Sequence, residues 1–168
     1  MSELPPLTPL ATAALHVGEP ERILQVQCGA GDGALFLARE FPRASVRGVD
    51  ADEAAIRHAS GRVGLDPEGR VAFKAGGPRK LPFPADLFDL VALLDAEPSP
   101  REVARVLRPG GFLVVARSTG GPAEGIGARL RRWRLRRRGI EPIWAESAGA
   151  GSYAVGRLRG GGPPAAAE

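Results

Sequence analysis

A short apolar segment followed at once by three closely spaced glycines constrains the fold of this chain more than any other feature. Residues 22–26 are mostly apolar and predict a buried strand, and residues 34–40 predict a helix. Between them, Gly29, Gly31 and Gly33 predict a tight loop. A strand, a glycine-rich turn and a helix in this order open a nucleotide-binding βαβ unit. Because glycine has no Cβ atom, the backbone of such a loop can pass close to a ligand.

An acid follows at the end of the next expected strand. Residues 45–49 predict this strand, and Asp50 comes directly after it. Its distance along the chain from the glycine loop is that expected for an acid that accepts hydrogen bonds from ribose hydroxyls. The alternative is a simple strand-end carboxylate, and the spacing favours the ribose ligand.

The rest of the chain alternates between expected helices and strands. Helices are expected over 10–17, 52–62, 99–107 and 128–138, and strands over 71–75, 88–94, 112–116, 140–145 and 153–158. Residues 108–111 are expected to end a helix in a turn. This alternation predicts an α/β fold with a Rossmann-like, doubly wound and mostly parallel sheet, in which the last two strands form an antiparallel hairpin at one edge. We expect one domain over residues 1–159 and a disordered tail over 160–168.

Composition favours an ordinary globular protein. The 168 residues are 43% hydrophobic and 25% charged, and the formal net charge of +4 is too small by itself to indicate a polyanionic partner. The lone Cys28 cannot form an internal disulfide and suits a reducing compartment. With neither a membrane-spanning run nor the pattern of a signal peptide, we expect a cytoplasmic protein without a membrane partner. We predict no metal site.

Three segments of the second half carry a resemblance to a known family. They are Leu81–Phe83, Phe88–Val91 and Glu102–Gly111. Together with the glycine loop, they make residues 21–159 resemble a class I S-adenosylmethionine-dependent methyltransferase of the small-molecule type. Gly29 and Gly31 also fit a dinucleotide-binding pattern, but that match is weak on its own. The third segment is typical of the methyltransferases and disfavours a dinucleotide oxidoreductase.

The resemblance implies that S-adenosylmethionine is bound beyond the carboxyl ends of the strands. Cys28–Gly31 would lie against its methionine portion and ribose, and Asp50 would hold the ribose hydroxyls. Ala51 would pack beside the adenine, and Gly77 with Pro78 would flank its edge. The cofactor-binding candidates are Gln25, Gln27, Cys28, Gly29, Gly31, Asp50, Ala51, Gly77, Pro78 and Leu94.

Three of these positions depart from the family pattern, so the cofactor motif is eroded. Gln25 stands where the family has an acid, and glutamine keeps hydrogen-bonding capacity but loses the charge. Gln27 replaces the first glycine of the loop, where its side chain would narrow the cofactor slot. Gly77 stands where the family often has an aspartate. The segment after Leu94, which lines the acceptor pocket in relatives, is short.

The sequence leaves two functions open. The first is an enzyme that transfers a methyl group from S-adenosylmethionine to an unidentified small-molecule acceptor. No residue is identified as catalytic: Asp95 is the candidate for a general base, and the alternative is a loop carboxylate that faces water. The second is a degenerate methyltransferase fold that serves as a binding or scaffold module.

A basic segment bears on the second function. Residues 129–138 hold seven arginines around Trp133 and are expected to form a helix, and contact of this helix with nucleic acid or an acidic partner is the alternative to a solvated arginine face. Against this, Ile126, Leu130 and Trp133 at helical spacing are expected to pack on the sheet and leave the arginines in solvent. The short segment before the first strand leaves the acceptor side open or closed by a second subunit, so the expected arrangements include a dimer.

Overall fold

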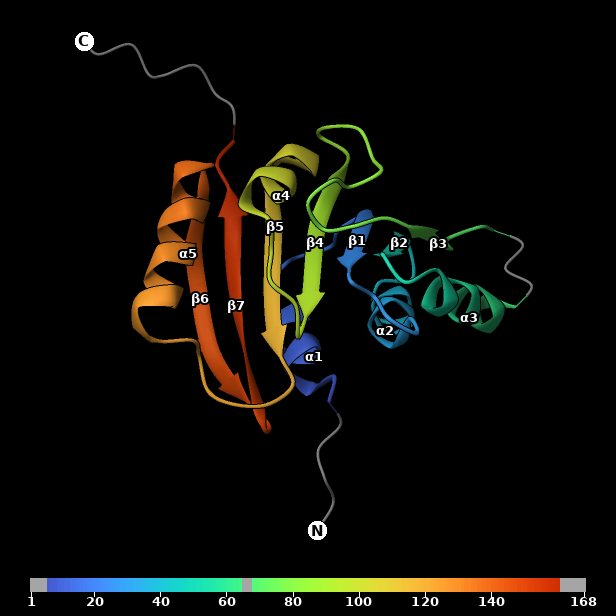
Figure 1. Cartoon of the computed structure of the whole chain (residues 1–168), viewed down its shortest axis with the longest axis horizontal. Coiled ribbons are helices and arrows are strands. Elements are labelled where there is room, and N and C mark those ends of the chain that lie inside the picture. The colour runs from blue at the N-terminus through green and yellow to red at the C-terminus, as the bar shows by residue number, and fades with distance from the viewer. Residues whose placement is uncertain (1–5, 65–67, 161–168) are drawn as a thin grey trace.

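The computed structural model describes residues 6–64 and 68–160 and contains one seven-stranded sheet with helices on both faces (Figure 1). The strands are β1 (Arg22–Val26), β2 (Ser45–Asp50), β3 (Val71–Ala75), β4 (Phe88–Leu94), β5 (Leu107–Arg117), β6 (Ile140–Ala148) and β7 (Gly151–Leu158). The helices are α1 (Thr8–Ala14), α2 (Asp32–Glu40), α3 (Glu53–Val63), α4 (Pro100–Val106) and α5 (Gly125–Arg137). In these two ranges, no helix combines the length and the apolar character needed to cross a bilayer. Apart from Gly160, the expected tail lies outside the described residues.

The strand order is β3-β2-β1-β4-β5-β7-β6. The first five strands pair in parallel, whereas β7 pairs antiparallel with both β5 and β6. The expected α/β fold with a mostly parallel sheet and an antiparallel edge pair is therefore confirmed. β6 forms one edge of the sheet, and its pairing with β7 shifts register between Pro142 and Trp144.

Two apolar layers cover the two faces of the sheet. Leu10 of α1 and Leu37 of α2 are buried with Ile23 on one face. Val103 and Val106 of α4 are buried with Leu24 on the other. Because both faces are covered, β4 is apolar at every position except Asp89, as the strands of parallel sheets commonly are.

The expected turn over residues 108–111 is wrong. These residues belong to β5, which pairs Leu107 with Phe88 and, after an irregularity in the register, Phe112 with Leu90. Gly111 permits this close pairing, since a Cβ atom there would lie 2.9 Å from the carbonyl oxygen of Arg108. The glycines therefore serve a bulged strand instead of a turn.

Two family-typical segments hold each other through a buried ion pair. The Glu102 carboxylate is buried and accepts hydrogen bonds from the Leu81 N–H (2.8 Å) and from the Arg105 guanidinium (2.8 and 2.9 Å). Arg105 also donates to the carbonyl oxygens of Leu81 (3.0 Å) and Phe83 (2.7 Å). The hydrogen bond from Arg105 is the main reason that the pKa of Glu102 is lowered. This cluster fixes the connection between β3 and β4 to α4.

Helix α5 presents the face opposite to the expected one. Ile126, Leu130 and Trp133 are 86%, 42% and 52% exposed, so the prediction that they pack on the sheet is wrong. Ala128 is the buried residue of α5, and the Arg137 guanidinium lies 4.9 Å from the centre of the Trp133 ring. Small Ala128 lets the helix approach the sheet, whereas the cation–π contact covers part of the outward-facing indole.

Candidate active site

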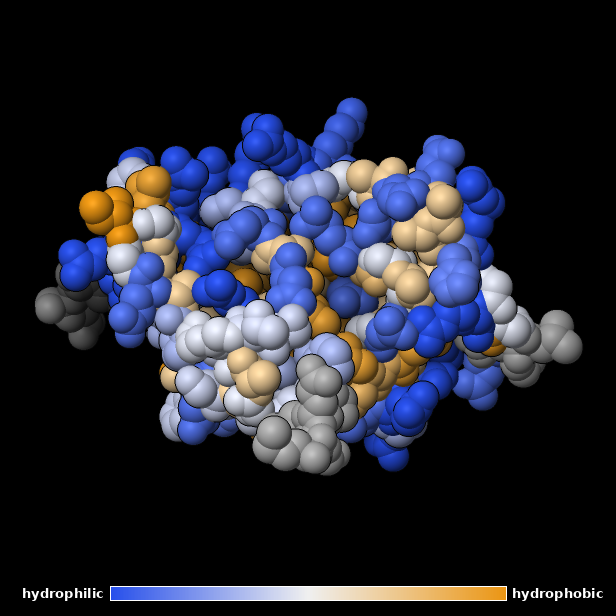
Figure 2. Space-filling model, turned by 60° about the horizontal axis from the view of Figure 1, so that its bottom comes forward, coloured by the Kyte–Doolittle hydropathy of each residue, from blue (hydrophilic) through white to orange (hydrophobic). Residues whose placement is uncertain are grey.

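All ten cofactor-binding candidates lie at or next to the carboxyl ends of the first four strands. In a parallel sheet these ends share one rim, and β1 lies between β2 and β4. The arrows of β1, β4 and β5 point to this rim in Figure 1. Figure 2 turns the rim forward and shows apolar atoms between polar side chains in the middle of this face. Topology therefore brings together residues from four separate segments.

The glycine loop continues the pairing of β1 with β2 and then turns into α2. The Cys28 N–H donates to the carbonyl oxygen of Val49 (2.9 Å), and the Gly31 N–H donates to that of Cys28 (2.9 Å). A Cβ atom on Gly31 would lie 2.9 Å from the Phe73 ring, so this glycine is needed for packing within the chain. A Cβ atom on Gly29 would meet nothing within 4 Å. Open space therefore lies beyond Gly29, where a ligand can approach the loop.

Asp50 ties this loop to the end of β2. Its half-buried carboxylate accepts hydrogen bonds from the N–H groups of Gly29 (Oδ2, 2.9 Å) and Asp52 (Oδ1, 2.9 Å). A carboxylate has about four acceptor positions, so roughly two remain for other donors. The Asp50 carbonyl oxygen accepts from the Gly76 N–H (3.0 Å), which places the turn that contains Gly77 and Pro78 beside it. Asp50 thus joins the first three strands at the rim.

Gln25 carries a buried acceptor without a donor. Its side chain is 3% exposed and lies against Gly33 in the first turn of α2. Among the described residues, its Oε1 atom has no hydrogen-bond partner. An unsatisfied buried polar atom costs about 1–3 kcal/mol, so a donor from outside the chain would stabilise this site. The sequence indicated the lost charge at this position but not the unmatched oxygen.

Gln27 adopts a backbone conformation that favours glycine. Its φ of 55° lies in the left-handed region, and its side chain is exposed. We expect Gln27→Gly to raise the free energy of unfolding by about 1 kcal/mol, because relief of strain outweighs the greater entropy of glycine in the unfolded chain. Urea unfolding would measure the gain, and Gln25→Gly, at a position without this strain, should instead destabilise the protein. A lower urea midpoint for Gln27→Gly than for the wild type would contradict the proposal that the backbone is strained at this position.

Cys28 is not poised to act as a nucleophile. Burial, and then the negative charge of Asp50, raise the pKa of its thiol to about 11. The thiol therefore stays protonated at neutral pH, and only the thiolate is a good nucleophile. Cys28 fills space under the loop.

The two acids after β4 are already bound within the chain. Asp95 accepts hydrogen bonds from the Ser118 N–H (2.8 Å) and hydroxyl (2.6 Å), and Arg131 donates to both carboxylate oxygens of Glu97 (2.6 Å each). Both acids line a cavity of about 560 Å³ between the ends of β4 and β5 and the start of α5. Asp95 joins the ends of β4 and β5, and its use as a base stays a prediction.

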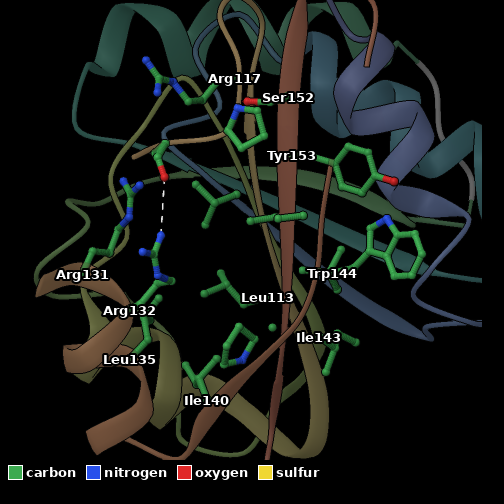
Figure 3. A pocket seen from close by; sticks show the side chains of 18 of the residues that line it. Leu113, Arg117, Arg131, Arg132, Leu135, Ile140, Ile143, Trp144, Ser152 and Tyr153 are labelled. Atoms are coloured by element: carbon green, nitrogen blue, oxygen red, sulfur yellow. Dashed lines mark hydrogen bonds between the residues drawn. The ribbon is translucent and has the colours of Figure 1, made fainter. Parts of the chain in front are cut away.

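A second cavity, of about 690 Å³, lies between α5 and strands β5, β6 and β7 (Figure 3). Sequence analysis did not identify it. One signal was present: residues 152–156 alternate small Ser152, Ala154 and Gly156 with larger Tyr153 and Val155. In a strand this alternation places the small residues on one face and leaves room above them.

Comparison with known proteins identifies the family of this chain. A family model described as a methyltransferase domain matches residues 23–111. The fatty-acid O-methyltransferase of Mycolicibacterium smegmatis is 40% identical over 113 residues, which cover 62% of this chain and 39% of that protein. The phthiotriol/phenolphthiotriol dimycocerosates methyltransferase of Mycobacterium leprae is 40% identical over 103 residues, covering 57% and 37%. The chain thus matches about two fifths of the length of these relatives.

Solved structures show the same fold at low sequence identity. A SAM-dependent methyltransferase from Aquifex aeolicus superposes with a TM-score of 0.73 at 18% identity, covering 91% of both chains. The geranyl diphosphate C-methyltransferase from Streptomyces coelicolor A3(2), solved with S-adenosyl-L-homocysteine, has a TM-score of 0.71 at 15% identity, covering 89% of this chain and 77% of its own. This chain therefore belongs to the methyltransferase domain family, and the resemblance to the class I S-adenosylmethionine-dependent methyltransferases is confirmed.

Proposed function

We propose that the protein transfers a methyl group from S-adenosylmethionine to a small-molecule acceptor. The observation that carries this proposal is the buried, unpartnered Oε1 atom of Gln25 beside a loop that Asp50 holds open at Gly29. The names of the relatives support a small-molecule acceptor.

The residues at the rim fit this cofactor. Asp50 has acceptor positions left for the two ribose hydroxyls, and the Gln25 Oε1 atom can accept a hydrogen bond from the amino group of the methionine portion. Ala51 is exposed beside Asp50, and a Cβ atom on Gly77 would meet nothing within 4 Å, which leaves space for the adenine. When bound, the cofactor supplies a methyl group on a positively charged sulfur, which is a good leaving group.

What this chain contributes is mainly alignment. Holding the acceptor in line with the methyl group removes translational and rotational freedom before the reaction. We place the acceptor in the cavity of about 560 Å³ beside Asp95. Both oxygens of Asp95 accept hydrogen bonds from Ser118, so we propose that Asp95 holds the wall of this cavity in place.

The variant Gln25→Met tests the cofactor site. Methionine has nearly the same size but no hydrogen-bond acceptor of comparable strength, so we expect S-adenosylhomocysteine to bind about 10-fold more weakly. The same variant should unfold at a higher urea concentration, because it removes an unsatisfied buried oxygen. Weaker binding together with greater stability distinguishes a ligand contact from damage to the fold.

Calorimetric titration measures the binding, and transfer of a labelled methyl group to candidate acceptors measures the activity. We expect micromolar binding of S-adenosylhomocysteine to the wild-type protein. Absence of heat at millimolar ligand, in a sample that is folded by circular dichroism, would overturn the proposal.

A further inference from the structure

The cavity beneath α5 has the volume of a ligand site. Its volume of about 690 Å³ falls within the range of about 300–1,000 Å³ that is usual for small-molecule pockets. It persists because β7 presents small residues to α5, while Ile126, Leu130 and Trp133 of α5 are exposed to solvent. It is open to solvent, since Ala145 and Ala154, which line it, are exposed. An open groove of this size that is lined by both apolar side chains and arginines has the character of a ligand site.

The two ends of this cavity differ in character. Figure 3 shows Leu113, Leu135 and Ile140 toward one end, and Arg117 and Ser152 toward the other. Arg117 is the last residue of β5 and pairs with Ser152 across the sheet. The polar end therefore lies at the carboxyl rim, and the apolar end lies beneath the last turns of α5.

The charges around the polar end favour an anion. Arg117, Arg129, Arg131 and Arg132 line the cavity, and Glu124 is the acid that lines it with them. Arg131 is paired with Glu97, and Arg132 donates to the carbonyl oxygen of Ala123 (3.4 Å). The side chains of Arg117 and Arg129 have no hydrogen bond or ion pair with residues 6–64 and 68–160. The guanidinium of Arg117 is thus available to a carboxylate or phosphate, which arginine binds in a bidentate manner.

The polar end also opens toward the proposed acceptor cavity. The two cavities share five lining residues, which are Val115, Arg117, Ala123, Glu124 and Arg131. A head group held by Arg117 would therefore lie at the boundary between the two cavities, with its chain running beneath α5.

We propose that the cavity beneath α5 binds an amphiphilic anion, with its apolar chain against Leu113, Leu135 and Ile140 and its carboxylate or phosphate head on Arg117. That this head group is the methyl acceptor rests on the proposed function, whereas the binding itself does not.

The test compares three ligands that share a twelve-carbon chain. Equilibrium dialysis of radiolabelled laurate, dodecyl phosphate and uncharged dodecanol, each below its aggregation concentration, gives their affinities for the wild-type protein. We expect one or both anions to bind about 10-fold or more tightly than dodecanol, because only they pair with the guanidinium. The better of the two anions identifies the head group. Equal binding of all three ligands would overturn the assignment of Arg117.

Two variants and one control locate the site. Arg117→Gln should weaken the binding of the two anions about 10-fold and leave the binding of dodecanol nearly unchanged. Ala154→Phe, which places a ring in the cavity, should abolish binding of all three ligands. Arg134→Gln removes an exposed arginine of α5 that does not line the cavity, and it should bind like the wild type. Binding of S-adenosylhomocysteine by each variant reports whether the fold and the cofactor site are retained.

The outcomes separate this inference from the proposed function. If Ala154→Phe abolishes binding but no methyl group is transferred to the bound anion, the binding site is supported. The proposal that its ligand is the methyl acceptor is then rejected. Binding that neither variant changes would overturn the inference. If none of the ligands binds and sedimentation shows a dimer that Ala154→Phe dissociates, a second copy of the chain occupies the cavity, and the inference is wrong.

Discussion

Replacement of Asp50 by alanine is expected to weaken the binding of S-adenosylhomocysteine by about 100-fold or more, as measured by calorimetry. The variant removes the acceptor proposed for both ribose hydroxyls, and each hydrogen bond to a charged group contributes about 1.5–3 kcal/mol. It also frees the Gly29 N–H and the Asp52 N–H, so the glycine loop loses its attachment to β2.

A matched variant separates the site from general effects of charge. Glu40→Ala removes an exposed carboxylate at the opposite end of α2, and it should bind S-adenosylhomocysteine like the wild type. Asp50→Asn keeps an oxygen acceptor, and its affinity for S-adenosylhomocysteine should lie between those of the wild type and Asp50→Ala. Unchanged affinity in Asp50→Ala would show that the ribose is held elsewhere.

The largest effect on stability is expected for Glu102→Ala, which should lower the free energy of unfolding by about 3 kcal/mol at pH 7. The variant leaves the Leu81 N–H without its acceptor and Arg105 without its counter-charge. Because Arg105 is partly exposed, its lost pairing is compensated in part by water, which places the effect at the lower end for a buried ion pair. Urea unfolding measures this loss, and Arg101→Ala, on the neighbouring exposed residue, is the control.

The difference in the free energy of unfolding between the wild type and Glu102→Ala should depend on pH. The hydrogen bond from Arg105 lowers the pKa of Glu102 in the folded protein below the ordinary value of 4.5. The stability contributed by this carboxylate is therefore complete above about pH 4.5 and is lost as the pH falls through the folded-state pKa. The gap between the wild type and Glu102→Ala should narrow on acidification, and a gap of constant size would contradict the role of the ion pair.

The positions of most elements followed from local patterns in the sequence. The strand that begins at Arg22, the glycine loop and the helix capped by Asp52 lie where their patterns predicted them, and the Asp52 carboxylate accepts from the Ala54 N–H (2.9 Å). The convergence of Asp50 on the loop followed from parallel topology alone. Such features depend on short segments and on one rule for connecting them.

The orientation of α5 could not be predicted from the sequence, because two faces of that helix fit a helical period. Ile126, Leu130 and Trp133 form one such face, and Ala128 with Leu135 lies on another. The choice depends on what lies beneath, which here is the small-residue face of β7 and the carboxylate of Glu97. Both come from distant parts of the chain.

The unsatisfied Oε1 atom of Gln25 could not be predicted from the sequence either. A glutamine in an apolar strand predicts a polar group in a buried position, but whether that group finds a partner depends on the neighbouring helix. Gly33 supplies no side chain to bond with it. Contact with nucleic acid through residues 129–138 stays the alternative to a solvated arginine face, which the sequence favours.

The register shift at Pro142 has a consequence for how this protein behaves at high concentration. An edge strand offers unpaired N–H and carbonyl groups to any other extended chain, and long regular edges of this kind are where β-aggregation begins. Pro142 removes one N–H from β6, and the irregularity before Trp144 interrupts its nine residues. The exposed apolar residues Ile143 and Trp144 are thus displayed on an edge that cannot readily template a further strand.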